Sequence, residues 1–125
     1  MRRGWLGQAH TSSKERPVLI LDLRGDDAVV ICGTSTAGRD LPCVTIDNKE
    51  RAGRVLQLRN PTHFYVTNIE RLKIAAIDAR GPCTHKIILD VDEMITAWLR
   101  DVYQARKYAG VIELTDDGPR LPIDP

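Results

Sequence analysis

The sequence predicts a mainly β protein: a small antiparallel β-barrel, or rolled sheet, followed by one C-terminal helix. Three observations support this fold class. Apolar runs of strand length recur between positions 17 and 78, separated by Gly, Pro, Asn and Asp. A helical repeat of apolar residues occupies only positions 90–107. The 125 residues suffice for one core but not for two, so positions 1–125 are predicted to form a single domain, with the barrel at about 14–89.

The N-terminal part of the barrel is predicted to be a buried hairpin. Positions 1–13 are polar and rich in Gly and Ser, and indicate a loop or a short, poorly formed strand. PVLILDL (17–23) is a strand that opens with Pro, a residue best tolerated at a strand's first position. RGDD (24–27) has the residues of a tight turn, and AVVIC (28–32) is the returning strand.

The middle of the chain is predicted to complete the sheet. A long connection holds one short strand, CVTID (43–47). VLQLR (55–59) alternates with period two, as a half-buried strand does. HFYVTNI (63–69) and LKIAAID (72–78) are two more strands, with Glu70 and Arg71 between them.

The C-terminal helix is predicted over positions 90–107. Asp90 and Glu93 have the spacing of a capping box, which would place the start of the helix at Asp90. Beyond it, VIEL suggests a short strand at the beginning of a Pro-rich tail, 111–125. The apolar stripe of the helix consists of Val91, Met94, Ile95, Trp98, Val102 and Ala105.

Composition and cysteine usage favour the cytoplasm. Hydrophobic residues make up 42% and charged residues 28% of the chain, as in an ordinary soluble protein. No stretch approaches the roughly 18 apolar residues of a membrane span, and no apolar signal region follows the first arginines. Cys32, Cys43 and Cys83 are odd in number and lack Cys-x-x-Cys spacing, which argues against a disulfide framework or a zinc site.

The net charge of +1 conceals an asymmetry between the two parts of the chain. Positions 1–89 hold 14 Lys and Arg against 9 Asp and Glu, a balance of +5. Positions 90–125 hold 4 against 8, a balance of −4. A basic body is compatible with a polyanionic ligand on one face, although a solvated surface of mixed sign is the commoner explanation of such a balance.

The sequence contains no metal motif, no Gly-rich phosphate loop and no Gly-x-Ser-x-Gly elbow. It does place Arg16 and the pair Thr34-Ser35 at the ends of two neighbouring strands. Taken alone, Arg16 is explained as a surface charge that guards a strand end, and the hydroxyl residues as turn formers.

The segments ERPVLIL, VVICGTS and LRNPTHFYVTNIERL, in this order, resemble the MazF/PemK family of toxin endoribonucleases. The resemblance covers about positions 14–78, and the placement of the final helix agrees with it. It implies an SH3-like barrel that forms a homodimer and cuts single-stranded RNA without a metal or another cofactor. It also implies an antitoxin protein that lies across the RNA groove of the dimer.

The resemblance assigns catalytic roles to Arg16, Thr34 and Ser35. Cleavage of RNA by its own 2′-hydroxyl needs a base, an acid and stabilisation of charge on the phosphorane. Arg16 matches the family's Arg before Pro, where it would bind the phosphate and could act as the acid. Thr34 and Ser35 match the Thr-Ser step, whose hydroxyls would hold the non-bridging oxygens.

The resemblance also implies substrate-binding positions and two departures from the family pattern. His10 lies where some members place a functional residue in a flexible loop, and Arg71 matches a family Arg. Asn68 stands where many members have Asp, and an amide cannot exchange a proton. In addition, the first strand of the family is shortened or absent in positions 1–13.

Two alternatives from other classes stay open. One is a catalytically silent barrel that binds RNA or a protein partner, because a fold alone does not determine function. The other is a CcdB-like, gyrase-poisoning toxin of the same fold, which often uses a terminal Trp at the end of its helix. The ending RLPIDP disfavours the second alternative.

Overall fold

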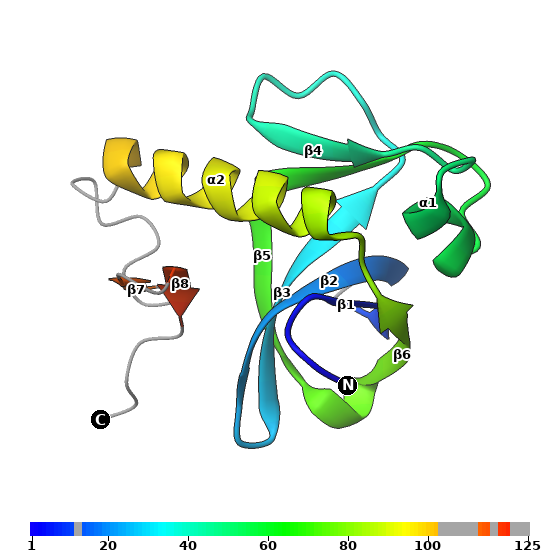
Figure 1. Ribbon diagram of the computed structural model, residues 1–125, viewed down its shortest axis with the longest axis horizontal. Coiled ribbons are helices and arrows are strands. Elements are labelled where there is room, and N and C mark those ends of the chain that lie inside the picture. The colour runs from blue at the N-terminus through cyan, green and yellow to red at the C-terminus, as the bar shows by residue number, and fades with distance from the viewer. Residues whose placement is uncertain (12–13, 103–112, 116–117, 121–125) are drawn as a thin grey trace.

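The computed structural model describes residues 1–11, 14–102, 113–115 and 118–120 and shows a six-stranded antiparallel sheet curled into a half-barrel (Figure 1). The strand order is β4-β5-β3-β2-β1-β6. A C-terminal helix, α2 (His85–Val102), lies across β4 and β5. This architecture confirms the predicted fold class. The strands of the sheet are β1 (Trp5–His10), β2 (Glu15–Arg24), β3 (Asp27–Thr34), β4 (Cys43–Ile46), β5 (Thr62–Lys73) and β6 (Ile77–Pro82).

The connection between β5 and β6 shows why the sheet curls. In the strand order, β3, β2 and β1 separate these two strands, yet only the three-residue 3-10 helix η1 (Ile74–Ala76) joins them along the chain. Such a short link requires the end of β5 and the start of β6 to lie close together. The sheet must therefore bend round on itself, and β6 pairs with β1 on the far side.

Both faces of the sheet are buried, and this explains the continuous apolar runs of β2 and β3. A strand sends alternate side chains to opposite faces, and here both sets are covered. One face packs against the buried stripe of α2, and the other is enclosed by the curl of the sheet. The apolar cluster on the α2 face includes Leu6, Leu19, Val29, Ile31, Phe64, Val91, Ile95 and Leu99. The apolar cluster on the other face includes Ala9, Val18, Ile20, Ala28, Val30, Cys32 and Ile77.

The predicted hairpin of positions 17–32 is confirmed, but the prediction for positions 1–13 is wrong. β1 is a full strand that pairs with β2 on one side and with β6 on the other. Gly7, which suggested a loop, lies inside this strand because a Cβ there would meet the Asp78 carbonyl oxygen at 2.8 Å. The glycine permits close approach of β6 and does not mark a break in the strand.

Two strand predictions in the middle of the chain are also wrong. VLQLR (55–59) is not a strand: its first residue, Val55, is the last of a short helix, α1 (Arg51–Val55), and the chain then enters a turn in which Gln57 has φ of 54°. The predicted strands 63–69 and 72–78 are divided in the wrong place. Glu70 and Arg71 continue β5 in register with Val30 and Val29, since neither is a turn-forming residue, and the chain reverses at η1.

The C-terminal helix is confirmed but begins at His85, five residues before the predicted start at position 90. Ile88 N–H donates to the Thr84 carbonyl at 3.2 Å, so the first helical hydrogen bond precedes Asp90. Asp90 is therefore not a cap; it accepts a bond from Lys86 Nζ at 2.8 Å, four residues earlier. Ile87 extends the apolar stripe towards the N-terminus and explains the earlier start.

Positions 103–107 of the predicted helix lie outside the described residues. In the predicted tail, β7 (Glu113–Thr115) and β8 (Gly118–Arg120) pair as a two-stranded antiparallel sheet, while positions 111–112 of the predicted strand VIEL are outside the described part. No helix among the described residues is both long and apolar enough to cross a membrane.

Candidate functional site

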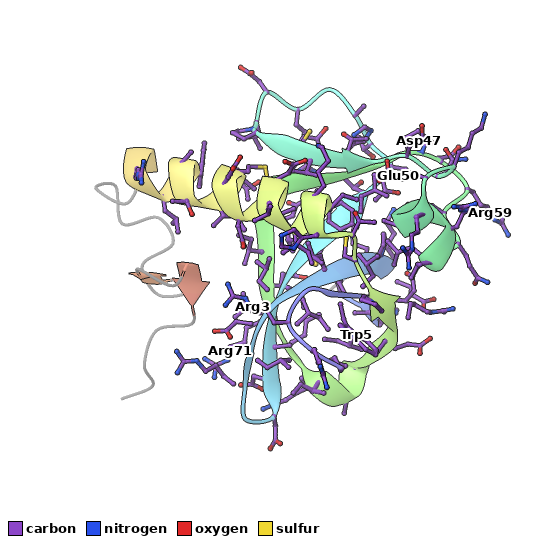
Figure 2. All side chains as sticks on the ribbon, in the orientation of Figure 1. Arg3, Trp5, Asp47, Glu50, Arg59 and Arg71 are labelled. Atoms are coloured by element: carbon purple, nitrogen blue, oxygen red, sulfur yellow. The ribbon has the colours of Figure 1, made fainter. Side chains whose placement is uncertain are left out.

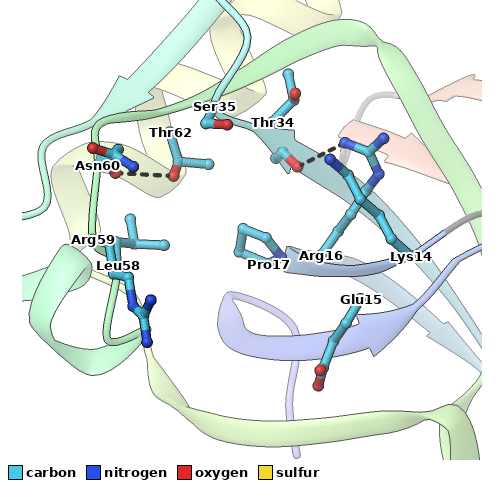
Figure 3. A pocket seen from close by; sticks show the side chains of 11 residues that line it. Lys14, Glu15, Arg16, Pro17, Thr34, Ser35, Leu58, Arg59, Asn60 and Thr62 are labelled. Carbon is cyan, nitrogen blue, oxygen red and sulfur yellow. Dashed lines mark hydrogen bonds between the residues drawn. The ribbon is translucent and has the colours of Figure 1, made fainter.

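Two adjoining pockets lie where β2 begins and β3 ends. Because neighbouring antiparallel strands run in opposite directions, the start of β2 and the end of β3 meet at one edge of the sheet. We call the first the basic pocket; its volume is about 200 Å³ and it contains Lys14, Arg16 and Arg59 (Figure 3). We call the second the β5 pocket; its volume is about 320 Å³ and Thr67–Glu70 of β5 form one wall.

Arg16 and Thr34 line both pockets, and Ser35 lines the basic pocket. The half-buried Arg16 side chain donates from Nη1 to the Gly33 carbonyl at 3.5 Å, which holds the guanidinium beside the end of β3 (Figure 3). The structure thus brings together the three residues to which the family resemblance assigns phosphate binding.

The two hydroxyl residues differ in burial. Thr34 is 8% exposed, and its Oγ1 accepts a hydrogen bond from Thr36 N–H at 3.2 Å, whereas Ser35 is exposed. The bond from Thr36 orients the Thr34 hydroxyl oxygen and leaves its proton available for donation. Thr34 is therefore a fixed donor and Ser35 an adaptable one.

The opposite wall of the basic pocket comes from the loop before β5. Leu58, Arg59 and Asn60 line it together with Thr62, whose Oγ1 donates to the Asn60 carbonyl at 3.3 Å. Arg59 was not predicted as a site residue because VLQLR was interpreted as a strand. The signal available in the sequence was Asn60-Pro61, which marks a loop in which the preceding Arg can face a pocket.

Asn68 lies in the β5 pocket, as does Glu70, which was predicted to lie between two strands. Cys32 Sγ donates to Glu70 Oε2 at 3.2 Å. Burial of Cys32, together with this bond and the nearby carboxylate charge, raises the pKa of its thiol to about 12. The thiol is therefore protonated at neutral pH and serves as a hydrogen-bond donor.

Arg39 adds a further cation to the β5 pocket. Its guanidinium carbon lies 5.6 Å from the centre of the Tyr65 ring, a distance at which a cation is attracted to an aromatic face. Tyr65 is itself held by a hydrogen bond from its hydroxyl to the Thr36 carbonyl at 3.2 Å. The segment after β3 is thereby joined to β5 at the rim of the pocket.

His10 and Arg71 are not brought to either pocket. His10 is exposed at the last position of β1, in register with Glu15. Arg71 donates from Nε to Asp27 Oδ2 at 2.8 Å, and Lys73 Nζ lies 2.8 Å from Asp27 Oδ1. Figure 2 shows Arg71 and Arg59 on opposite sides of the molecule.

The described residues contain no group of three or more His, Cys, Asp or Glu side chains placed to hold a metal ion. The charged groups of the two pockets are instead mostly cations: Lys14, Arg16, Arg59 and Arg39, with the carboxylates of Glu15 and Glu70 among them. A site of this composition favours an anionic ligand with several oxygens, because guanidinium groups present paired donors to such oxygens.

Comparison with known proteins supports the fold. No protein-family model and no curated protein matches the chain, but solved structures do. The Mycobacterium tuberculosis toxin MazF-mt6 is similar with a TM-score of 0.62 and 21% identity, over 77% of this chain and 96% of that one. A chain of the MazE–MazF structure from Deinococcus radiodurans is similar with a TM-score of 0.60 and 14% identity, over 79% of this chain and 94% of that one.

A third similar structure is an endoribonuclease in complex with its cognate antitoxin from a mycobacterial species, with a TM-score of 0.58 and 17% identity, over 80% of this chain and 93% of that one. At these identities the likeness concerns the fold. The chain therefore has a MazF-like fold.

Proposed function

We propose that this protein is the endoribonuclease toxin of a toxin–antitoxin pair and that it cleaves single-stranded RNA without a metal ion. The observation that carries the proposal is the meeting of Arg16, Thr34 and Ser35 in one basic pocket at the ends of two adjacent strands. The MazF-like fold supports it.

The pocket offers what attack by the RNA 2′-hydroxyl requires around the phosphate. Arg16 supplies a permanent charge and paired N–H donors for the phosphoryl oxygens. The Thr34 and Ser35 hydroxyls donate to the same oxygens as negative charge builds up on them. Lys14 and Arg59, which line the same pocket, add electrostatic attraction for the phosphodiester backbone of RNA.

The substrate-binding role of the site falls to Asn68 in the β5 pocket. Its amide offers both a donor and an acceptor, so it can pair with an edge of an unstacked base. Single-stranded RNA fits this arrangement because its bases can be splayed into a pocket beside the backbone. His10 and Arg71 lie outside the two pockets and have no part in this proposal.

The proposal includes an antitoxin partner, a homodimer and a cytoplasmic location. Two of the similar structures are complexes, one of MazE with MazF and one of an endoribonuclease with its cognate antitoxin. An acidic segment of an antitoxin is a suitable occupant of a site that carries Lys14, Arg16, Arg39 and Arg59, because it would neutralise the charges that attract RNA.

A catalytically silent, RNA-binding barrel is the second candidate. Asn68 favours it, since the resembling family often has Asp at this position and an amide cannot act as acid or base. Both candidates predict RNA binding. Only the first predicts strand cleavage.

The test is incubation of the purified protein with fluorescently labelled single-stranded RNA in the presence of EDTA. The expected products carry a 2′,3′-cyclic phosphate and a 5′-hydroxyl. Arg16→Ala should abolish most of the cleavage, while Arg100→Ala, which removes an exposed arginine of α2 remote from both pockets, should not. RNA that is bound but stays intact would select the silent barrel.

A further inference from the structure

We propose that Glu70 is the general base of this site and takes the proton from the attacking 2′-hydroxyl. The proposal rests on the endoribonuclease activity proposed above. The Glu70 carboxylate supplies the proton acceptor that the reaction needs. Arg16, Thr34 and Ser35 cannot supply it, since all three act as donors to phosphate oxygens. A carboxylate beside the phosphate site can accept that proton.

The strand register brings Glu70 to the face of the sheet that carries Arg16. Glu70 pairs with Val30, and Val18 pairs with Cys32. Side chains of directly paired residues point to the same face, and so do residues two apart along one strand. Glu70, Cys32 and Arg16 therefore project from β5, β3 and β2 into one space, the β5 pocket, which Thr34 also lines.

The Cys32 thiol holds the Glu70 carboxylate in place. Its Sγ donates to Oε2 at 3.2 Å, and because the thiol stays protonated at neutral pH it remains a donor there. Among the residues that the structure describes, Oε1 has no hydrogen-bond partner. One carboxylate oxygen is thus anchored at the buried side of the pocket while the other is available to a ligand.

Glu70 is better suited to this role than the other carboxylate near Arg16. Glu15 lines the basic pocket, but it is exposed at the first residue of β2. Glu70 is half-buried within a long strand, where its position is fixed more tightly. The titratable and charged groups that share the β5 pocket with Glu70 are Arg16 from β2, Cys32 from β3 and Arg39 from the segment after β3.

The cleavage step uses Glu70, Arg16 and one water molecule. Glu70 accepts the 2′-hydroxyl proton, and an oxygen lone pair of O2′ forms the new bond to phosphorus. The bond between phosphorus and O5′ breaks, its electron pair stays on O5′, and a water molecule protonates that oxygen. Arg16 stabilises the charge on the phosphorane. The proton held by Glu70 then neutralises the hydroxide that remains, and the products are a 2′,3′-cyclic phosphate and a 5′-hydroxyl.

The experiment measures kcat/KM for single-stranded RNA between about pH 4.5 and 8.5 for the wild type, Glu70→Gln and Glu70→Asp. Loss of a general base typically costs about 10²- to 10⁴-fold, so Glu70→Gln should fall by at least about 10² at neutral pH. It should also lose the acidic limb of the pH profile, where protonation of the base reduces the rate. Glu70→Asp keeps a carboxylate and should keep that limb at a reduced rate.

Glu93→Gln is the matched control, because it makes the same chemical change at an exposed position of α2. Thermal unfolding of each variant establishes that it is folded. If the wild type cuts RNA and the kcat/KM of Glu70→Gln is within about threefold of the wild-type value, the inference is overturned and the proposed function stands. A Glu70→Gln protein that cuts more slowly but keeps the acidic limb of the pH profile also overturns the inference. Loss of that limb in Glu15→Gln does so as well. A wild type that cuts no RNA overturns the proposed function and the inference together.

Discussion

Arg16 is tied to Gly33 across two strands: its Nη1 donates to the Gly33 carbonyl at 3.5 Å. At this length the bond is a weak restraint, so the remaining N–H groups of the guanidinium can be committed to a ligand. Gly33 directly precedes Thr34, and the bond therefore sets the cation beside the hydroxyl with which it shares both pockets. A Cβ at Gly33 would meet Thr62 Cγ2 at 2.5 Å and Phe64 Cζ at 2.9 Å, so glycine at this position permits the close approach of β5 to β3.

Arg16→Ala should reduce RNA cleavage by about 10²-fold or more, because one preorganised donor to transition-state charge is typically worth about 3–4 kcal/mol. Arg16→Lys should recover only part of the rate, since an ammonium group lacks the paired donors of guanidinium. Initial rates on labelled RNA measure both effects. An Arg16→Ala protein that cuts at the wild-type rate would remove Arg16 from the mechanism.

Thr34→Ala should reduce cleavage less than Arg16→Ala, because Ser35 and the backbone amides at the end of β3 can take over part of the donation. The double variant Thr34→Ala/Ser35→Ala should lose more than the two single effects added as free energies, since each hydroxyl compensates for the other. Rates of the four proteins in one double-mutant cycle give this coupling. Strict additivity would show that the two hydroxyls act independently.

The fold class could be predicted from the sequence, and so could the meeting of Arg16 with Thr34 and Ser35, but the second pocket could not. The hairpin of β2 and β3 has strong local signals, namely two apolar runs and a turn with Gly25 at φ of 56°. Arg16 and Thr34 flank that hairpin, and an antiparallel pairing necessarily brings them together. This part of the site was predictable because it depends on neighbouring elements in the chain.

The rest of the site depends on pairings that are distant in the sequence. Glu70 was predicted to lie between two strands because two charged residues interrupt the apolar pattern of β5, and only its pairing with β3 places it opposite Val30. Arg59 reaches the basic pocket through a loop whose course is set by α1. β1 was missed for a similar reason: its Gly7 is required by contact with β6, about 70 residues later.

The protein should be a homodimer, as the resemblance implies, and dimerisation should be independent of the catalytic residues. Multi-angle light scattering at about 10–50 μM should give twice the chain mass of 14.0 kDa for the wild type and for Arg16→Ala. Dilution should lower the apparent mass if the protomers exchange. A mass of one chain throughout this range would contradict the prediction.

Ile95→Ala should destabilise the protein by about 2–5 kcal/mol, because Ile95 is fully buried between α2 and the sheet. Leu89→Ala is the matched control on the same helix: its side chain is 46% exposed, so the change should stay within about 0.5 kcal/mol. Urea unfolding monitored by circular dichroism gives both values. Equal effects of the two variants would show that α2 does not pack on the sheet as described.

Asp27→Asn should lower the free energy of unfolding at pH 7, and the deficit relative to the wild type should vanish in acid. Asp27 accepts bonds from Lys73 and Arg71, and the bond from Lys73 is the largest cause that lowers the pKa of this carboxyl below its ordinary 3.8. A carboxyl whose pKa is lower in the folded state than in the unfolded state stabilises the fold above the unfolded pKa. That stabilisation is lost as the pH falls through the folded pKa.

The deficit of Asp27→Asn should therefore be constant from about pH 7 to 5 and shrink below pH 3.8. Urea unfolding at pH 7, 5, 3.5 and 2.5 measures it. Asp78→Asn is the comparison, because Asp78 also pairs with an arginine, Arg80 at 3.1 Å, but its side chain is 68% exposed. Water screens such a pair, so its deficit should be small at every pH. A deficit of Asp27→Asn that stayed the same at pH 2.5 would mean that the side chain stabilises the β2–β3 turn by its shape and not by its charge.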